Sequence, residues 1–312
     1  MKAQTLYFFL LTVFMFVSCE MKARVLQKDL SLLTNVKYDY NQSLTVDLGG
    51  RYFSGEAEIM VYSLEKARYD SVHKGQAILV QVVEPFLYEE QVKNDRGGEK
   101  GSLNVLKSNY FERFTTGVYD YSLMTSAFTP LQYDTLQHSI KVSASVQDWC
   151  GQTYVQINNR GSLNLSMNSY FQSEGDSSYR IENTWQEDEI MNLIRLSTDV
   201  LPVDTFLIVP KATYLSTNHV SPKAYTAIGG LSLDTLDNMV YTISMPELKR
   251  TVKYYFDTSK ENLITQMEEE YPTVFDGEIR KSTAKLKSVQ KMPYWELNSP
   301  SFERLRAKMK LR

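Results

Sequence analysis

The chain has 312 residues, of which 43% are hydrophobic, and its formal net charge is −3. This length allows one large domain or two smaller ones, and the weak negative charge argues against electrostatic binding of nucleic acid by the whole protein. The 21 Tyr and 14 Phe stand beside only 14 Gly and 9 Pro. Abundant Tyr, Val and Thr favour half-buried strands, so the composition indicates a β-rich protein.

The N-terminus has the proportions of an export signal. Lys2 precedes an apolar run over residues 6–17, which is too short to span a bilayer comfortably. The run ends next to Cys19, and this arrangement resembles the lipobox of bacterial lipoproteins. We therefore predict a signal peptide over residues 1–18, and a lipidated Cys19 with a tether over 19–35. The alternative is an ordinary secretory signal with an incidental Cys.

Lipidation of Cys19 leaves Cys150 without a partner in the chain. An unpaired thiol in an exported protein is buried, joined to another molecule, or a nucleophile. Free Cys is among the most often buried residue types, so we expect Cys150 to pack beside Trp149.

A thiol hydrolase would need a His close to Cys150, and the chain has only His73, His138 and His219. If the strand over 138–149 pairs with the next one, His138 lies roughly 30 Å from the thiol, at the far end of the pair. Cys150 is therefore a weak catalytic candidate.

Alternation of apolar and polar residues predicts strands along most of the chain. The predicted strands cover residues 51–62, 76–86, 103–114, 116–128, 138–149, 153–158, 163–171, 204–209, 224–228, 239–245 and 250–257. Residues 63–69 interrupt the first pattern, and the dense apolar run of the second strand indicates burial on both faces. Pro85 is expected to end that second strand, because Pro removes a ladder donor. Residues 94–101 are predicted to form a solvated loop.

Two helices are predicted in the body of the chain. The first covers residues 185–196, where Thr184 and Glu187 have the spacing of a capping box. Three acidic residues over 187–189 are expected to form its solvated first turn, although they could alternatively hold calcium. The second helix is predicted over residues 261–270, from the spacing of its apolar side chains.

The predicted fold is mainly β, with a large antiparallel sheet as a half-barrel or as two sequential sheets. This domain is expected to cover residues 36–279, either undivided or split near 184–202, with the mid-chain helix between the two parts. Residues 280–312 hold ten Lys or Arg and two Glu. Helical spacing of Phe302, Leu305 and Met309 predicts that this basic segment docks on the domain as a short amphipathic helix, which Tyr294 and Trp295 would anchor to the sheet. Alternatively, this segment contacts anionic lipid.

Four segments carry a family resemblance. Residues 55–59, 116–126, 147–151 and 294–298 resemble an uncharacterised family from Bacteroidota genomes, whose members are predicted lipoproteins often labelled "septum formation inhibitor". The nucleotide pyrophosphatases of that name carry an early Ser-x-Ser-Pro-Arg-Arg signature, which this chain lacks, so their activity is not expected. The strand pattern also looks like periplasmic half-barrel proteins that bind or shuttle lipophilic ligands.

The resulting hypothesis is a lipid-anchored protein of the cell envelope, on the outer membrane and facing the periplasm. It would bind a lipophilic ligand or an envelope protein, with no cofactor and no nucleic acid partner. The candidate binding residues are Trp149, Tyr154, Tyr119 and Tyr121.

The different-class alternative is a periplasmic hydrolase. It would use Cys150 or the carboxylates of Glu174 and Asp176, although a tight turn explains that acidic pair better. No metal site is expected from protein ligands, because two Cys and three scattered His do not give a zinc spacing.

Overall fold

The structure is a computed structural model that describes residues 54–96, 101–131, 136–236 and 238–311. All of them belong to the unit Ser43–Arg312, which is described here by itself. The predicted signal peptide, the predicted lipid site at Cys19 and the predicted tether lie outside the described residues. Within the described ranges, no helix is both long enough and apolar enough to cross a membrane.

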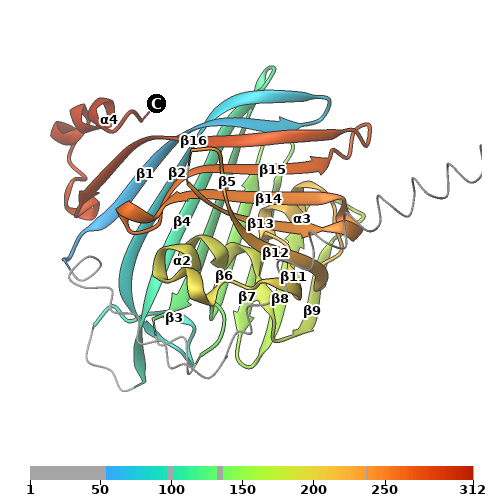
Figure 1. Ribbon diagram of the computed structural model, residues 1–312, viewed down its shortest axis with the longest axis horizontal. Helices are drawn as coiled ribbons and strands as arrows, with labels where there is room; N and C mark the ends of the chain where they lie inside the picture. The colour runs from blue at the N-terminus through green and yellow to red at the C-terminus, as the bar shows by residue number, and fades with distance from the viewer. Residues whose placement is uncertain (1–53, 97–100, 132–135, 237, 312) are drawn as a thin grey trace, which may run out of the picture. The chain divides into compact units, whose positions relative to one another are not determined.

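One open, mainly antiparallel sheet contains all the strands of the described chain (Figure 1). In sheet order its strands are β10 (Trp185–Gln186), β11 (Asp204–Val209), β12 (Tyr225–Leu233), β13 (Met239–Met245), β14 (Arg250–Asp257), β15 (Leu263–Pro272), β16 (Ile279–Met292), β1 (Ala57–Arg68), β2 (Ser71–Leu87), β4 (Ser102–Thr116), β5 (Tyr119–Pro130), β6 (Lys141–Gln147), β7 (Gln152–Asn159), β8 (Ser162–Ser169) and β9 (Asp176–Glu182). The two-residue β3 (Val92–Lys93) pairs with the end of β2. Neighbouring strands are antiparallel except β10 and β11.

Pairing of β1 with β16 makes the sheet continuous. Ala57 lies opposite Met292, and the register runs from there to Glu65 and Thr283. The two edge strands of the sheet, β9 and β10, follow one another in the chain. The alternative division near 184–202 therefore falls between the two edges of one sheet, and the strands on either side of it do not form two separate sheets. Residues 280–292 of the basic segment are a central strand and not a docked tail. Successive side chains of this segment point to opposite faces of the sheet, as in any strand.

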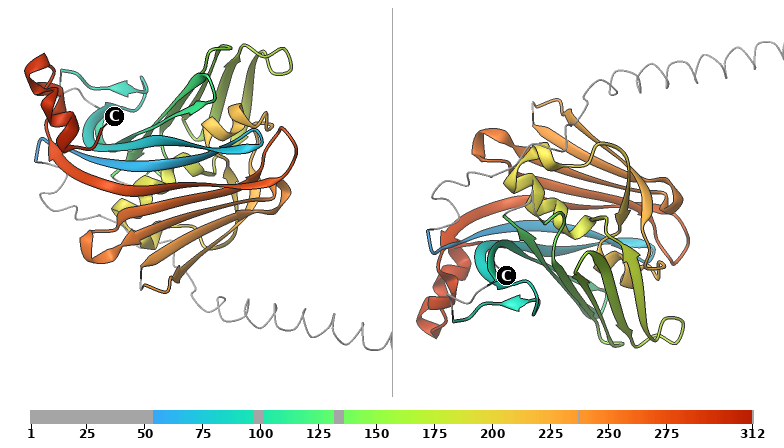
Figure 2. Two further views of the ribbon diagram at one scale, coloured as in Figure 1. Left: turned by 90° about the horizontal axis from the view of Figure 1, so that it is seen from above. Right: turned by 90° about the horizontal axis from the view of Figure 1, so that it is seen from below.

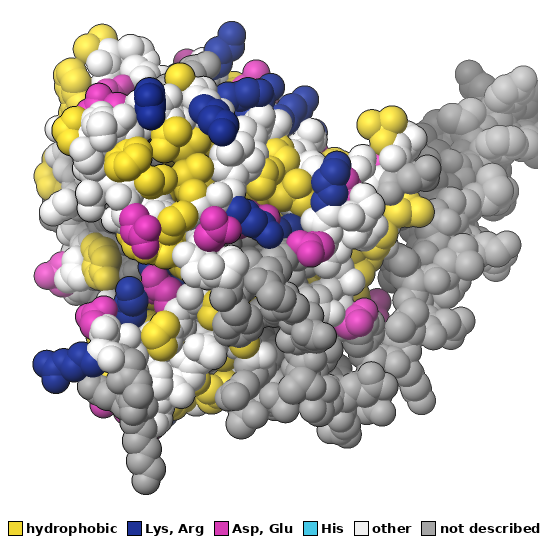
Figure 3. Space-filling view, turned by 90° about the vertical axis from the view of Figure 1, so that its left-hand side faces the viewer, with side chains coloured by type: hydrophobic (Ala, Val, Ile, Leu, Met, Phe, Trp, Pro, Cys, Tyr) yellow, Lys and Arg dark blue, Asp and Glu magenta, His cyan; other side chains and the backbone are white. Residues whose placement is uncertain are grey.

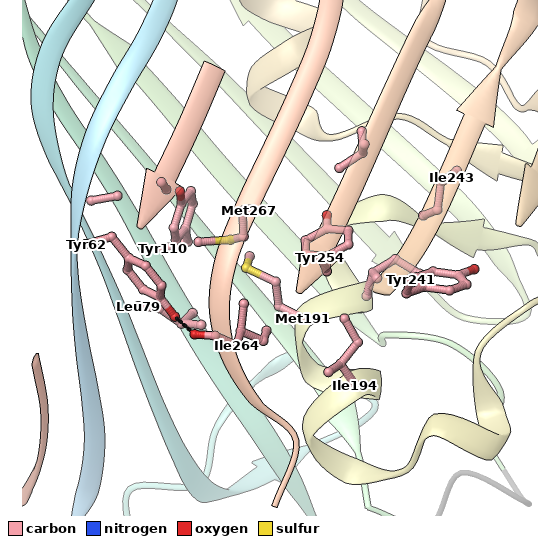
Figure 4. Packing of buried hydrophobic residues seen from close by; sticks show 14 of the residues in the cluster. Tyr62, Leu79, Tyr110, Met191, Ile194, Tyr241, Ile243, Tyr254, Ile264 and Met267 are labelled. Carbon is pink, nitrogen blue, oxygen red and sulfur yellow. Dashed lines mark hydrogen bonds between the residues drawn. The ribbon is translucent and has the colours of Figure 1, made fainter. Parts of the chain in front are cut away.

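Helix α2 (Ile190–Leu196) packs inside the bend of the sheet. Figure 2 shows the strands β1–β9 and β10–β16 on either side of it. The short helix α3 (Ala212–Thr217), which the sequence pattern did not predict, packs on β5, β6 and β7. The core between these layers is continuous: Tyr62, Tyr110, Tyr241 and Tyr254 belong to one buried cluster with Met191 of α2 (Figure 4). Half of the sixteen described Tyr side chains are buried and thus belong to the core.

Two predicted strand ends are wrong. β1 continues through residues 63–68, and the apparent break is the buried Lys66, which lies on the core face and pairs there with Glu112 and Glu269. β2 continues past Pro85 to Leu87. The Pro85 carbonyl accepts a hydrogen bond from the Asn94 N–H at 2.9 Å, so its ring nitrogen also points away from β4 and removes no bond from that pairing. The predicted burial of both faces of β2 is confirmed.

The predicted helix over 261–270 is wrong, since these residues form most of β15. The pairing of β14 with β15 shifts register between Tyr255 and Phe256, and Thr265 is left as the extra residue of a bulge. The bulge places Ile264 and Met267, three positions apart, on the same buried face. A three-residue spacing that suggests a helix therefore arises here from an interrupted strand.

The mid-chain helix and the C-terminal helix are confirmed, with altered starts. The 3-10 turn Glu187–Glu189 precedes α2, and the Glu189 carboxylate accepts the Gln186 N–H at 3.1 Å. The predicted capping by Thr184 is wrong, because its hydroxyl donates to the Leu207 carbonyl in the sheet at 2.7 Å. At the C-terminus, a 3-10 turn (Pro300–Phe302) leads into α4 (Arg304–Lys308).

Candidate functional site

The turn between β6 and β7 places Cys150 at the surface. The Asp148 carboxylate accepts the N–H groups of Cys150 at 2.7 Å and Gly151 at 3.1 Å, which closes the turn beyond the strand ends. Cys150 is exposed, and Trp149 is 71% exposed. The prediction of a thiol packed beside Trp149 is therefore wrong, because this turn extends past the core.

The three histidines contact groups other than Cys150. The Nδ1 atom of His138 lies 3.0 Å from Glu189, and that of His219 lies 2.7 Å from Glu174. The Nε2 atom of His73 lies 3.2 Å from the Arg68 carbonyl. These contacts of the described residues give no support to a thiol hydrolase. They also give Glu174 a structural partner, in place of a role in a catalytic carboxylate pair.

Three of the four predicted binding residues lie together at the end of the sheet that holds the β4–β5 and β6–β7 turns, which we call the hairpin end. The rings of Tyr119 and Trp149 are 6.5 Å apart. The hydroxyls of Tyr119 and Tyr121 lie 2.8 Å and 2.7 Å from the hydroxyl of Tyr69, which joins them. The fourth residue, Tyr154, hydrogen bonds within its own strand. This aromatic cluster is partly exposed but surrounds no described cavity.

The acidic residues 187–189 are buried, so their prediction as a solvated first turn is wrong. The carboxylate of Glu187 pairs with the guanidinium of Arg250, with Nη2 and Oε1 at 2.6 Å, and the same guanidinium nitrogen lies 2.6 Å from Glu269. Glu189 instead faces His138. Each carboxylate thus reaches a different partner, and among the described residues no group of three side chains could hold a metal ion.

A network of ion pairs continues from Arg250 across the core face. Lys66 Nζ lies 3.1 Å from Glu112 and 3.3 Å from Glu269, and Lys211 Nζ lies 3.6 Å from Glu112. Burial acts to raise the pKa of Glu269, but Lys66 and Arg250 outweigh it and hold that pKa well below its usual value. We call Lys66, Glu112, Glu187, Lys211, Arg250 and Glu269 the ionic cluster. Its three positive and three negative charges balance.

Asp188 stands beside the ionic cluster without a full set of partners. Its Oδ2 atom accepts the Ala212 N–H at 2.9 Å, whereas its buried Oδ1 atom has no hydrogen-bond partner among the described residues. Burial raises the pKa of Asp188 to about 7. A proton on this carboxyl group near neutral pH is therefore a property of the folded state.

Beside the ionic cluster, the concave side of the sheet has little room for a ligand among the described residues. The space beside the ionic cluster is only about 40 Å³, and Glu112, Glu187 and Lys211 are among the residues that line it. A volume of this size holds about one water molecule. Among the described residues, the ionic cluster therefore packs closely and leaves no room beside it for a larger ligand.

A larger cavity of about 300 Å³ lies on the opposite face of the sheet, beneath the C-terminal segment. Its lining is apolar except for Tyr294 and Arg306. The lining residues are Ile59, Ile78, Val80, Phe111, Met292, Tyr294, Leu297, Phe302, Leu305, Arg306, Met309 and Leu311. Strands β1, β2 and β4 supply its floor, and the last residue of β16 together with the residues after it supplies its cover. We call this the C-terminal cavity, and its face of the molecule is seen in Figure 3.

Both ends of the cover are attached to the sheet. Residues 293–311 leave β16 at Pro293 and return at Met309, which is buried against Ile59 and Val80. The Met309 carbonyl accepts a hydrogen bond from the Ser288 hydroxyl at 2.6 Å, and the Lys310 carbonyl accepts one from Gln76 at 2.8 Å. The cover is therefore a closed strap over apolar strand residues.

The predicted docking of the C-terminal amphipathic segment is confirmed for its last part. Phe302 and Leu305 line the C-terminal cavity, and Met309 packs on the sheet. Tyr294 also lines the cavity, but Trp295 is 44% exposed and anchors less than expected. The floor residues were missed as a site, because alternating apolar residues in a strand do not reveal that one face is covered by a strap.

Comparison with known proteins adds no relative of the chain. No protein-family model, no curated protein and no solved structure matches it. The functional argument therefore rests on the geometry of the C-terminal cavity and of the hairpin end.

Proposed function

We propose that the protein is a cell-envelope lipoprotein that binds a lipophilic ligand in the C-terminal cavity. The supporting observation is the cavity itself, with about 300 Å³ of space and ten purely apolar side chains among its twelve lining residues. Small-molecule sites have this size and this mostly apolar lining, with few polar groups. The strap over the cavity would cover part of a bound chain.

The proposed anchor is the lipid on Cys19, on the outer membrane and facing the periplasm. The supporting observations are the apolar run over residues 6–17 and the position of Cys19 next to it. Metabolic labelling with a fatty acid tests the anchor: label that persists in the variant Cys19→Ala would exclude it.

Filling the C-terminal cavity should remove ligand binding. In the double variant Leu297→Trp/Leu305→Trp, two indole rings occupy space that the ligand needs, so the affinity for a fluorescent fatty acid is expected to fall at least tenfold. The measurement is a fluorescence titration of the full-length chain. Both positions are partly exposed in the strap, so the fold should tolerate the larger rings.

The matched control is Leu207→Trp/Leu233→Trp, which adds the same rings at exposed sites on β11 and β12. This control should bind the probe as the unmodified chain does. Equal binding by the cavity-filled and control variants would refute the proposed site, as would a lack of saturable binding by the unmodified chain.

A second candidate function is the binding of an envelope protein at the hairpin end. The observation that favours it is a set of exposed apolar side chains on separate hairpin turns: Val118 (81%), Trp149 (71%), Tyr170 (62%) and Phe275 (65%). Exposed apolar patches of this kind often mark interaction sites. This candidate is compatible with the cavity, since the two sites lie on different parts of the sheet.

Cys150 reports directly on the hairpin end. Its thiol is exposed, so a maleimide reagent should label purified protein in seconds to minutes without denaturant. Much slower labelling in the native envelope fraction would support a bound partner there. Equal rates in the two preparations would argue against one, and protection in the purified protein would contradict the exposed turn.

A further inference from the structure

We infer that the ligand of the C-terminal cavity is a single alkyl chain with an anionic head group, which Arg306 binds at the mouth. This inference rests on the proposed function, since it specifies the ligand class of the same cavity. It has two independent supports, namely the size of the cavity and the charge around it.

The volume suits one chain. A methylene group is similar in size to a water molecule, whose share of liquid volume is about 30 Å³, so a cavity of about 300 Å³ accommodates about ten such groups. The two chains of a diacyl lipid would need at least twice this volume. A chain of about ten carbons therefore matches the volume of the cavity.

The polar groups of the lining lie in the strap. Arg306, which is exposed, is the one charged residue among the twelve that line the cavity, and it stands one position after Leu305 on α4. The floor strands contribute only apolar side chains to the cavity. The chain of an amphiphile would thus lie on the floor, while its head group reaches solvent beside the guanidinium. The planar guanidinium binds carboxylate or phosphate oxygens in a two-point geometry.

The surrounding surface favours an anion. On the face seen in Figure 3, Lys and Arg side chains lie beside hydrophobic ones along the upper edge, and Asp and Glu side chains are interspersed over the same face. The described strap and the neighbouring part of β16 supply exposed cations at Lys285, Lys287, Lys291, Arg304, Lys308 and Lys310. Against these stand Glu296 and Glu303. A surface with this excess of positive charge raises the local concentration of anionic ligands and disfavours cationic ones.

The test compares three ten-carbon ligands that differ only in the head group. Decanoate, decyl phosphate and decanol each displace the fluorescent fatty acid from the full-length chain in a buffer of fixed ionic strength. We expect the anion that binds more tightly, decanoate or decyl phosphate, to displace the probe at a concentration about fivefold below that of decanol. A difference of this size is typical of an ion pair at a partly exposed site. Preference for decanoate indicates a free fatty acid, and preference for decyl phosphate indicates a single-chain phospholipid.

Variants assign the preference to one side chain. Arg306→Gln should bring the anions and decanol to equal affinity, and Arg304→Gln, which removes the same charge from a residue outside the lining, should keep the difference. Both residues are exposed, so neither change should affect folding.

The outcomes separate the two proposals. If decanol binds to the unmodified chain as tightly as the anions, the head-group inference is overturned while the cavity remains a lipophilic site. If both Arg variants lose the preference equally, the general positive field acts and the role of Arg306 is refuted. If none of the three ligands displaces the probe, the proposed function itself fails.

Discussion

Replacement of Arg250 by Met should destabilise the protein by about 3–5 kcal/mol. Arg250 is fully buried and contacts two carboxylates, those of Glu187 and Glu269, through hydrogen bonds of 2.6 Å. Methionine fills most of the same volume but leaves both carboxylates without their main counter-charge. Desolvation of the unpaired charge, rather than lost packing, is the origin of this expected loss.

Urea unfolding followed by Trp fluorescence measures the effect. The double variant Arg250→Met/Glu187→Gln should recover part of the loss, because the more deeply buried of the two carboxylates that contact Arg250 is then replaced by a neutral amide. Lys223→Met is the matched control. It breaks the Lys223–Glu247 pair, whose side chains are more than half exposed, so no measurable change is expected. A loss below about 1 kcal/mol for Arg250→Met would show that the ionic cluster contributes little to the stability of the fold.

Replacement of Asp188 by Asn should stabilise the protein in a pH-dependent way. Burial raises the pKa of Asp188 from its usual value of 3.8 to about 7. The folded state therefore binds the proton more tightly than the unfolded state. The stabilisation by this proton is complete below about pH 4 and is lost as the pH rises toward 7. The asparagine side chain keeps an acceptor for the Ala212 N–H and never ionises.

The advantage of Asp188→Asn over the unmodified chain should grow by about 2–3 kcal/mol between pH 5 and pH 8. Urea unfolding at both pH values measures it. Asp199→Asn, at an exposed position just after α2, is the control and should show no such growth. A constant difference for Asp188→Asn would mean that Asp188 is ionised throughout, with its unpartnered oxygen reached by water.

The opposite trend is expected from the ionic cluster. The pKa of Glu269 is lowered by Lys66 and Arg250 despite burial, so its contribution is present above about pH 4.5 and is lost as the pH falls below that value. Together with Asp188, this predicts a stability maximum in mildly acidic solution.

The local sequence pattern predicts most strands, but it does not predict which distant residues each strand contacts. Alternation identifies eleven of the sixteen strands of the described chain, because one face of each of these is buried, but β3, β9, β10 and the central β16 are not identified as strands. It fails at residues 261–270, where the bulge at Thr265 gives two buried residues a helical spacing. It also fails at Lys66, whose charge suggests a strand end although its partners Glu112 and Glu269 lie 46 and 203 residues away. Long-range ion pairs of this kind leave no local signal.

The candidate site is predictable only in part. The amphipathic spacing of Phe302, Leu305 and Met309 correctly indicates a docked segment, but it does not specify the strands on which that segment lies. The floor residues come from strands far earlier in the chain, so only the pairing of β1 with β16 brings the strap over them. Conversely, Trp149 and Cys150 stand out in the sequence but lie on an exposed turn.

The most direct test of the proposed site is a crystal structure of the protein with 10-bromodecanoate. Anomalous scattering from bromine locates the end of the alkyl chain without bias from the protein. We expect one bromine peak between the floor residues Ile78 and Val80 and the strap residue Leu305, with the carboxylate beside Arg306. Bromine bound elsewhere, with the C-terminal cavity empty, would contradict the proposal.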